Sequence, residues 1–140
     1  MTFYAVIDTN VILSSILTAN PLSPTIGIIE AIGEDRLVPL YSDYLLDEYK
    51  EVLDRSKFRI PDIVRDNMMY LFTQHGIRIQ PSDVEQALPD PNDAPIFMIA
   101  METRNLDSYL VTGNIKHFPA VDYVVTPRKM IEILYGSNHF

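Results

Sequence analysis

Short apolar runs alternate with longer amphipathic segments along this chain. The short runs are rich in branched and aromatic residues, which is typical of buried β-strands. The first and clearest of them is FYAVI, close to the start of the chain. We predict strands at 3–7, 37–41, 77–79, 109–111 and 123–125.

Between these runs, apolar residues recur at the spacing of an amphipathic helix. The first such pattern starts after residue 8, is interrupted at Asn20 and Pro21, and resumes through Ile32. Ser42 is a typical N-cap for the helix that follows the second strand. Further helices are predicted at 43–54, 61–76, 93–104 and 127–135. In the second of these four, the residues predicted to face inward are Ile63, Met68, Leu71 and Phe72.

Strands that alternate with helices, and that are apolar on both faces, indicate a parallel sheet covered by helices on each side. We therefore predict a three-layer α/β/α sandwich formed by a single domain, residues 1–140. Segment 81–92, which holds three prolines, is predicted to be a loop.

Composition narrows the possible functions. The chain has no cysteine, which excludes disulfides, thiolate metal sites and cysteine nucleophiles. It shows neither a signal peptide nor an apolar run of the ~18 residues that cross a membrane. We expect a cytoplasmic protein that does not enter membranes.

The net charge is −8, from 19 acidic and 11 basic residues. This balance argues against non-specific binding of nucleic acid across the whole surface. It still allows a local basic strip beside a group of acids, provided that a cation neutralises those acids.

Candidate site residues lie where strands end and helices begin. Asp8 follows the first strand directly, and Asp93 opens a predicted helix, although both also suit a helix N-cap. Glu48 lies at the border of a buried helical stripe, where it either reaches the sheet edge or is simply a surface residue. Thr112 and Asn114 follow the fourth strand.

Sites in open α/β sheets form outside the carboxyl ends of the strands, near a switch in strand order. Carboxylates gathered there from separate elements suit Mg²⁺ or Mn²⁺, which take oxygen ligands and retain water. Such a metal activates water and stabilises charge on a phosphoryl group. The spacing alone does not show that the acids converge.

Four segments of the chain, taken together and in order, resemble the PIN domain family, and more narrowly its VapC-like branch of toxin–antitoxin toxins. Each segment is a weak signal alone, but the set spans nearly the whole chain. The segments are VIDTNV at 6–11, LDEY at 46–49, DPND at 90–93 and LVTGNIKHFP at 110–119.

The resemblance implies a parallel sheet flanked by helices and a metal-dependent endoribonuclease activity on single-stranded RNA. It also implies a cognate antitoxin and a homo-oligomer. Asp8, Glu48 and Asp93 would be the catalytic, metal-binding acids. Many family members carry a fourth acid where this chain has Asn114, so a second metal would be held less tightly.

Other polar residues are assigned supporting roles. Thr112 and Asn114 are expected to orient ligands or waters, and Gly113 to allow close backbone approach. Asn10 is expected to support the site, and Asp90 to share or replace the role of Asp93. The cations expected to contact RNA are Arg55, Lys57, Arg59, Lys116 and His117. For His117, local hydrogen bonding is favoured over general-base catalysis, and the 55–59 cluster can equally be a solvated linker.

Two other classes of function compete with the nuclease. A PIN scaffold that has lost catalysis would bind RNA or a protein without cutting RNA. A receiver domain needs a phospho-acceptor aspartate at the end of a middle strand, and 77–80 provides none. An aspartate-nucleophile phosphatase needs a second acid two residues after the first, where Asn10 stands.

Overall fold

A computed structural model describes residues 1–80 and 94–136, and the predicted loop at 81–92 lies outside them. Five strands form one parallel sheet in the order β3-β2-β1-β4-β5. The strands are β1 (Phe3–Ile7), β2 (Leu37–Tyr41), β3 (Ile77–Arg78), β4 (Tyr109–Val111) and β5 (Val124–Val125). All five predicted strands are therefore confirmed, with β3 and β5 one residue shorter than expected.

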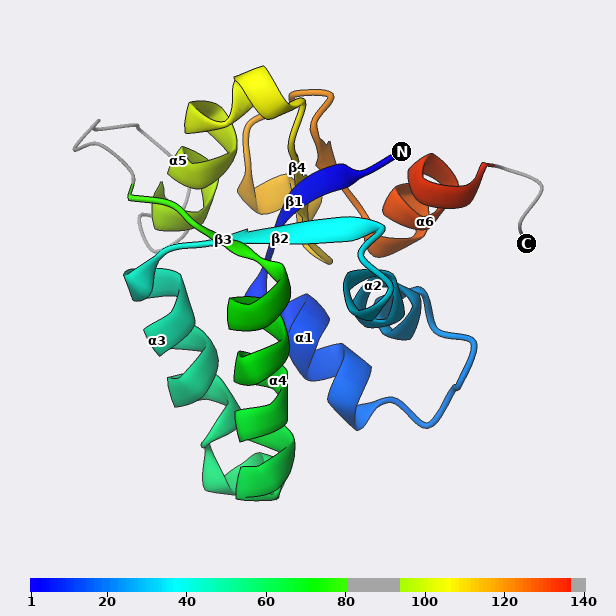
Figure 1. The fold of residues 1–140 in the computed structure, drawn as a ribbon. Coiled ribbons are helices and arrows are strands. Elements are labelled where there is room, and N and C mark those ends of the chain that lie inside the picture. Colours follow the sequence, from blue (N-terminus) through cyan, green and yellow to red (C-terminus); the bar gives the residue numbers. More distant parts are fainter. Residues whose placement is uncertain (81–93, 137–140) are drawn as a thin grey trace.

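The described residues also form six α-helices, shown with the strands in Figure 1. They are α1 (Thr9–Leu17), α2 (Pro24–Gly33), α3 (Asp43–Leu53), α4 (Asp62–His75), α5 (Ala94–Glu102) and α6 (Pro127–Tyr135). Short 3₁₀ turns are η1 (Ser56–Phe58), η3 (Arg104–Leu106) and η4 (Ile115–His117). None of the helices in 1–80 and 94–136 is long and apolar enough to cross a membrane.

Helix starts follow the capping chemistry of the sequence. Ser42 accepts a hydrogen bond from the backbone N–H of Leu45, as predicted for an N-cap. Ser23 and Thr126 cap α2 and α6 in the same way, each with proline in the first turn. These local signals fix the points at which the chain turns from the sheet into a helix.

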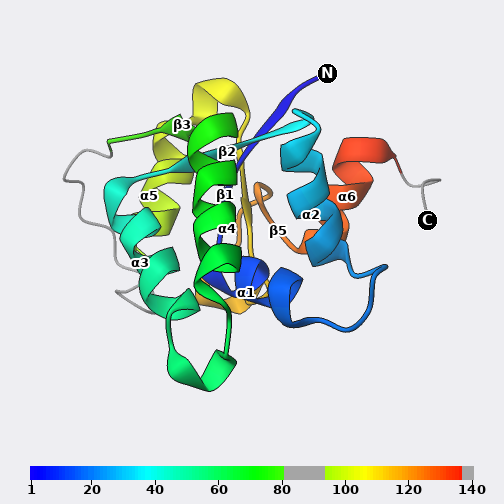
Figure 2. The ribbon, with the colours of Figure 1, turned by 60° about the horizontal axis from the view of Figure 1, so that its bottom comes forward.

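The direction in which the chain crosses the sheet decides which face each helix covers. From β1 the chain moves outward to β2 and β3, and then returns past β1 to β4. Because crossovers between parallel strands are right-handed, helices of the two halves must lie on opposite faces. Accordingly, α2 and α4 pack on β2, while α5 packs on β1 and β4 from the other side (Figures 1 and 2). The predicted three-layer α/β/α sandwich is confirmed.

The core lies between the sheet and these helices. β1 is buried at its last three residues, and α5 contributes a nearly continuous apolar face. In α4, Phe72 and Met69 are buried and Met68 and Leu71 are partly buried, but the prediction that Ile63 faces inward is wrong, since it is 66% exposed. Ile63 and Phe72 are nine residues apart, which at about 100° per residue puts them on opposite sides of the helix.

Candidate functional site

The site forms at the carboxyl ends of β1 and β4, the two adjacent strands at which the chain changes direction. Ile7 pairs with Val111, so the next residues, Asp8 and Thr112, emerge side by side. The backbone N–H of Asp8 donates to the carbonyl of Val111 at 2.9 Å, which extends the strand pairing to the edge of the site. Residues more than a hundred positions apart in sequence are thereby fixed together.

The Asp8 carboxylate is held from two sides. The hydroxyl of Thr112, which is fully buried, donates to Asp8 Oδ2 at 2.7 Å. The side-chain amide of Asn10 donates to the same oxygen at 3.2 Å. Asp8 occupies the N-cap position of α1, but its side chain forms no capping hydrogen bond. The geometry therefore favours a site residue over a helix cap.

The electrostatic state of Asp8 reflects its surroundings. Burial raises the pKa of this carboxyl above its ordinary value by penalising the ionised form. Hydrogen bonds from Thr112, the Thr9 backbone and Asn10, together with the charge of His117, oppose the rise without cancelling it. A nearby cation therefore stabilises the ionised form of this desolvated carboxylate.

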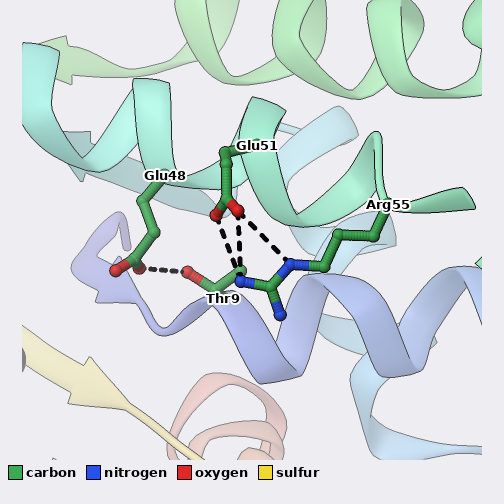
Figure 3. A network of polar contacts seen from close by, with 4 residues as sticks. All are labelled: Thr9, Glu48, Glu51 and Arg55. Carbon is green, nitrogen blue, oxygen red and sulfur yellow. Dashed lines mark hydrogen bonds and ion pairs between the residues drawn. The ribbon is translucent and has the colours of Figure 1, made fainter.

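Glu48 reaches the same region from α3. The Thr9 hydroxyl, at the first residue of α1, donates to Glu48 Oε2 at 2.5 Å. Figure 3 shows this contact, and it also shows that Glu51, one turn further along α3, pairs instead with Arg55. The two glutamates therefore differ in their contacts, because Glu48 meets the start of α1 whereas Glu51 pairs with Arg55 and its side chain is 64% exposed.

Tyr49 explains why α3 lies where it does. Its ring is fully buried and packs edge-on against Phe72, with ring centres 5.4 Å apart. Its hydroxyl donates to the carbonyl of Ile7, the residue before Asp8. Burial, followed by the negative charges of Asp8 and Glu48, raises the pKa of Tyr49 well above its ordinary value. Both carboxylates thus act on one buried hydroxyl.

The roles of Tyr49 and Thr9 were not predicted from the sequence. In the sequence, Tyr49 falls in the buried stripe of its helix, a position that indicates packing alone. The available signal was a hydroxyl in an otherwise apolar stripe, since buried tyrosine hydroxyls usually find a hydrogen-bond partner.

The Thr112-Gly113-Asn114 segment forms one wall of the site. The Asn114 backbone N–H donates to the Thr112 hydroxyl at 3.0 Å, and the Gly113 N–H donates to Asn10 Oδ1 at 3.2 Å. A Cβ at Gly113 would make only ordinary contacts, with Asn10 Oδ1 at 3.4 Å. The expectation that glycine is needed here for close approach is therefore wrong; this residue acts through its N–H.

Oxygen donors dominate the described part of the site. Asp8 and Glu48 supply carboxylates, and Thr112 and Asn114 supply neutral oxygens, a donor set that suits Mg²⁺ or Mn²⁺ rather than zinc. Within residues 1–80 and 94–136, no three acidic or histidine side chains converge on one point. The third predicted metal-binding acid, Asp93, and the supporting Asp90 lie outside the described residues.

The predicted RNA-contacting cations fall into two groups. Lys116 and His117 lie in η4, directly after Asn114, and the charge of His117 acts on Asp8. The second group lies at the turn between α3 and α4, where Arg55 pairs with Glu51 at 3.2 Å. In the same turn, the Lys57 ammonium lies 5.1 Å from the centre of the Phe58 ring, and Arg59 is exposed with a left-handed backbone (φ 53°).

A family model for the PIN domain matches residues 4–116, which include both acids and the Thr112-Asn114 wall. The chain belongs to the PIN domain family. PIN domains are generally nucleases that use divalent metals, which agrees with the oxygen donors at the strand ends. Comparisons with curated proteins and with solved structures found no match.

Proposed function

We propose that this PIN domain protein is a metal-dependent endoribonuclease that hydrolyses phosphodiesters of single-stranded RNA. The observation that carries the proposal is that Glu48 contacts Thr9, the residue that follows Asp8 at the switch in strand order. Each carboxylate is held by a hydroxyl from a different element, Asp8 by Thr112 and Glu48 by Thr9. Carboxylates fixed in this way suit the binding of a hard cation.

The residues of the site divide into holding and contacting roles. Asp8 and Glu48, with Asp93, would hold Mg²⁺ or Mn²⁺, which when bound supplies an activated water and neutralises charge on the phosphoryl group. Thr112 and Asn10 orient Asp8 through hydrogen bonds of 2.7 and 3.2 Å.

Other residues position the second carboxylate and the RNA strand. Tyr49 donates a hydrogen bond from α3 to the end of β1, and so fixes the helix that carries Glu48. Lys116 and His117, exposed immediately beyond Asn114, provide positive charge for the RNA phosphates.

We further propose that the protein is the toxin of a toxin–antitoxin pair and forms a homo-oligomer in the cytoplasm. The toxin role is supported by the order of the four motifs along the chain. Oligomer or antitoxin contact is supported by exposed apolar side chains around the end of α1, with Leu17 47% and Leu22 86% exposed. The cysteine-free composition fits a reducing compartment.

Cleavage of a mixed-sequence single-stranded RNA in Mn²⁺, Mg²⁺ or EDTA tests the nuclease. We expect Asp8→Asn and Glu48→Gln each to reduce cleavage more than about 100-fold, because each removes a metal-holding carboxylate. Glu51→Gln is the matched control on α3, since Glu51 pairs with Arg55 instead of with Thr9. Cleavage that survives Asp8→Asn in a folded, purified protein would contradict the assignment.

One observation favours a second function. Asn114 is neutral at the position where many family members have a fourth acid, which points to a PIN scaffold that binds RNA or a protein without cutting RNA. The same assay separates the two functions, because such a scaffold leaves RNA intact in every metal. In that case, restored cleavage by Asn114→Asp would identify the missing charge as the cause.

A further inference from the structure

A small pocket of about 230 Å³ opens beside the candidate metal site. One wall is α1, with Asn10, Val11 and Ser14, and the opposite wall is Gly113 and Asn114 from the end of β4. Residues at the starts of α2 and α6 complete the lining. The pocket is slightly smaller than the roughly 300–1,000 Å³ typical of sites for drug-sized ligands, so it suits a smaller group.

The pocket joins directly to the network that holds Asp8. Asn10 lines it and donates to Asp8 Oδ2, and Asn114 lines it and donates through its backbone to the Thr112 hydroxyl. Thr112 in turn donates to the same Asp8 oxygen. A group bound in the pocket would therefore lie one side chain away from the carboxylate on which the proposed hydrolysis depends.

The pocket is neutral and has unused hydrogen-bonding capacity. All of its lining residues are uncharged, in contrast to the acids and cations nearby. Within residues 1–80 and 94–136, neither the Ser14 hydroxyl nor the Asn114 carboxamide makes a side-chain hydrogen bond, whereas Asn10 is engaged at both ends of its amide. Together the two open groups can donate and accept.

These properties select among the parts of an RNA strand. A phosphate needs cations, which this pocket lacks. A nucleobase in single-stranded RNA presents both donors and acceptors on its edge and apolar faces to its neighbours. Pro127, which is partly exposed, offers apolar surface for a face of the base, while Ser14 and Asn114 offer polar groups for the edge.

We propose that this pocket, with Ser14 and the side chain of Asn114, binds the nucleobase next to the scissile phosphate and sets the base preference of the protein. The proposal rests on the proposed ribonuclease function and names a determinant of its specificity. It assigns a role to Ser14, which sits on α1 and is solvent-exposed.

Two substitutions at Ser14 separate shape from hydrogen bonding. Ser14→Ala keeps the space and removes the hydroxyl, whereas Ser14→Leu fills the pocket. Thr73→Leu, at an exposed position of α4, is the matched control for adding leucine to a helix surface. Dissociation constants for four labelled single-stranded RNAs, each rich in one base, are measured by fluorescence anisotropy at low salt in EDTA, where binding is read without cleavage.

We expect the wild type and Thr73→Leu to rank the four RNAs identically. Ser14→Leu should weaken the best-bound RNA by about tenfold, the scale of one lost polar contact together with exclusion of the base, and should level the ranking. Ser14→Ala should level the ranking with a smaller loss of affinity. If a folded Ser14→Leu protein kept the affinity and the ranking of the wild type, the proposal that this pocket binds a base would be wrong.

Cleavage in Mn²⁺ distinguishes failure of the pocket from failure of the nuclease. If cleavage depends on Asp8 but wild type and Ser14→Leu prefer the same bases, the base-binding role of the pocket is wrong and the ribonuclease function is supported. Absence of cleavage by the wild type, with a ranking that Ser14→Leu still abolishes, would overturn the nuclease and support a base-binding pocket on an RNA-binding scaffold.

Discussion

At the scale of single residues, Asp8 shows function and stability in conflict. Burial raises its folded-state pKa above the ordinary value of 3.8, so the fold prefers the protonated carboxyl. Such a group contributes stability that is fully present below pH 3.8 and is lost as the pH rises through the folded-state value. At neutral pH the ionised Asp8 therefore lowers the free energy of unfolding when no cation is bound.

We accordingly predict that Asp8→Asn, measured in EDTA at pH 7, has a higher melting temperature than the wild type. The difference should shrink as the pH falls toward 3.8, because the protonated carboxyl resembles the amide. Thermal denaturation across this pH range measures it, with the exposed α3 residue Asp47, as Asp47→Asn, for comparison. A less stable Asp8→Asn protein would mean that the bonds from Thr112 and Asn10 outweigh burial.

At the scale of elements, the junction between α4 and β3 depends on one glycine. A Cβ at Gly76 would lie closer than 3.0 Å to the carbonyl oxygens of Phe72 and Pro39, a separation that real Cβ atoms do not show. The backbone there is extended (φ −102°, ψ 177°), so the requirement is space and not conformation. Gly76 thus lets the end of α4 lie directly against β2.

We predict that Gly76→Ala lowers the free energy of unfolding by about 1–3 kcal/mol, the usual cost of overpacking. Gly33→Ala is the matched control, because a Cβ at this last residue of α2 meets nothing within 4 Å. Alanine favours a helix over glycine by up to about 1 kcal/mol, so this variant should be as stable as the wild type or more so. Urea denaturation compares them, and equal losses in both would contradict the packing argument.

The elements themselves were largely predictable from the sequence because their signals are local. The run at 3–7 is apolar throughout, and Ser42 and Thr126 provide caps that need no tertiary information. Ile63 was misplaced because its neighbourhood in sequence is amphipathic, whereas its angular position relative to Phe72 puts it toward solvent. The spacing of apolar residues identified the helix, but the angular position of each residue around the helix axis was needed to identify the buried face.

The site was predictable in part, from the order of the strands. Parallel strands bring their carboxyl ends to one edge, so the meeting of Asp8 with Thr112 follows from the strand order. Helical position already favours Glu48, which borders the buried stripe of α3, but it does not show whether this carboxylate reaches the strand ends. That depends on where Tyr49 anchors α3 and on the partner that Thr9 offers, which are tertiary contacts.

At the scale of the whole molecule, the charge of −8 opposes the approach of RNA. Affinity for RNA must then come from a few cations along the path of the bound RNA and from uncharged contacts, such as those in the pocket beside Asn114. Lys57 lies in the turn beyond Glu48 and Glu51, while Lys129 lies on α6 and pairs with Glu132 at 3.5 Å. The two lysines contribute equally to net charge but lie on different elements, η1 and α6.

This difference gives a test of local against global charge. Each phosphate contact on single-stranded RNA contributes a slope of about −0.7 to the plot of log affinity against log salt. We predict that Lys57→Ala makes the slope shallower by about that amount, because it removes one contact. Lys129→Ala should leave the slope unchanged. Anisotropy titrations over a series of salt concentrations measure both. Equal slopes in the two variants would show that RNA does not follow the α3–α4 turn, and would leave Lys116 and His117 as the cations that meet the strand.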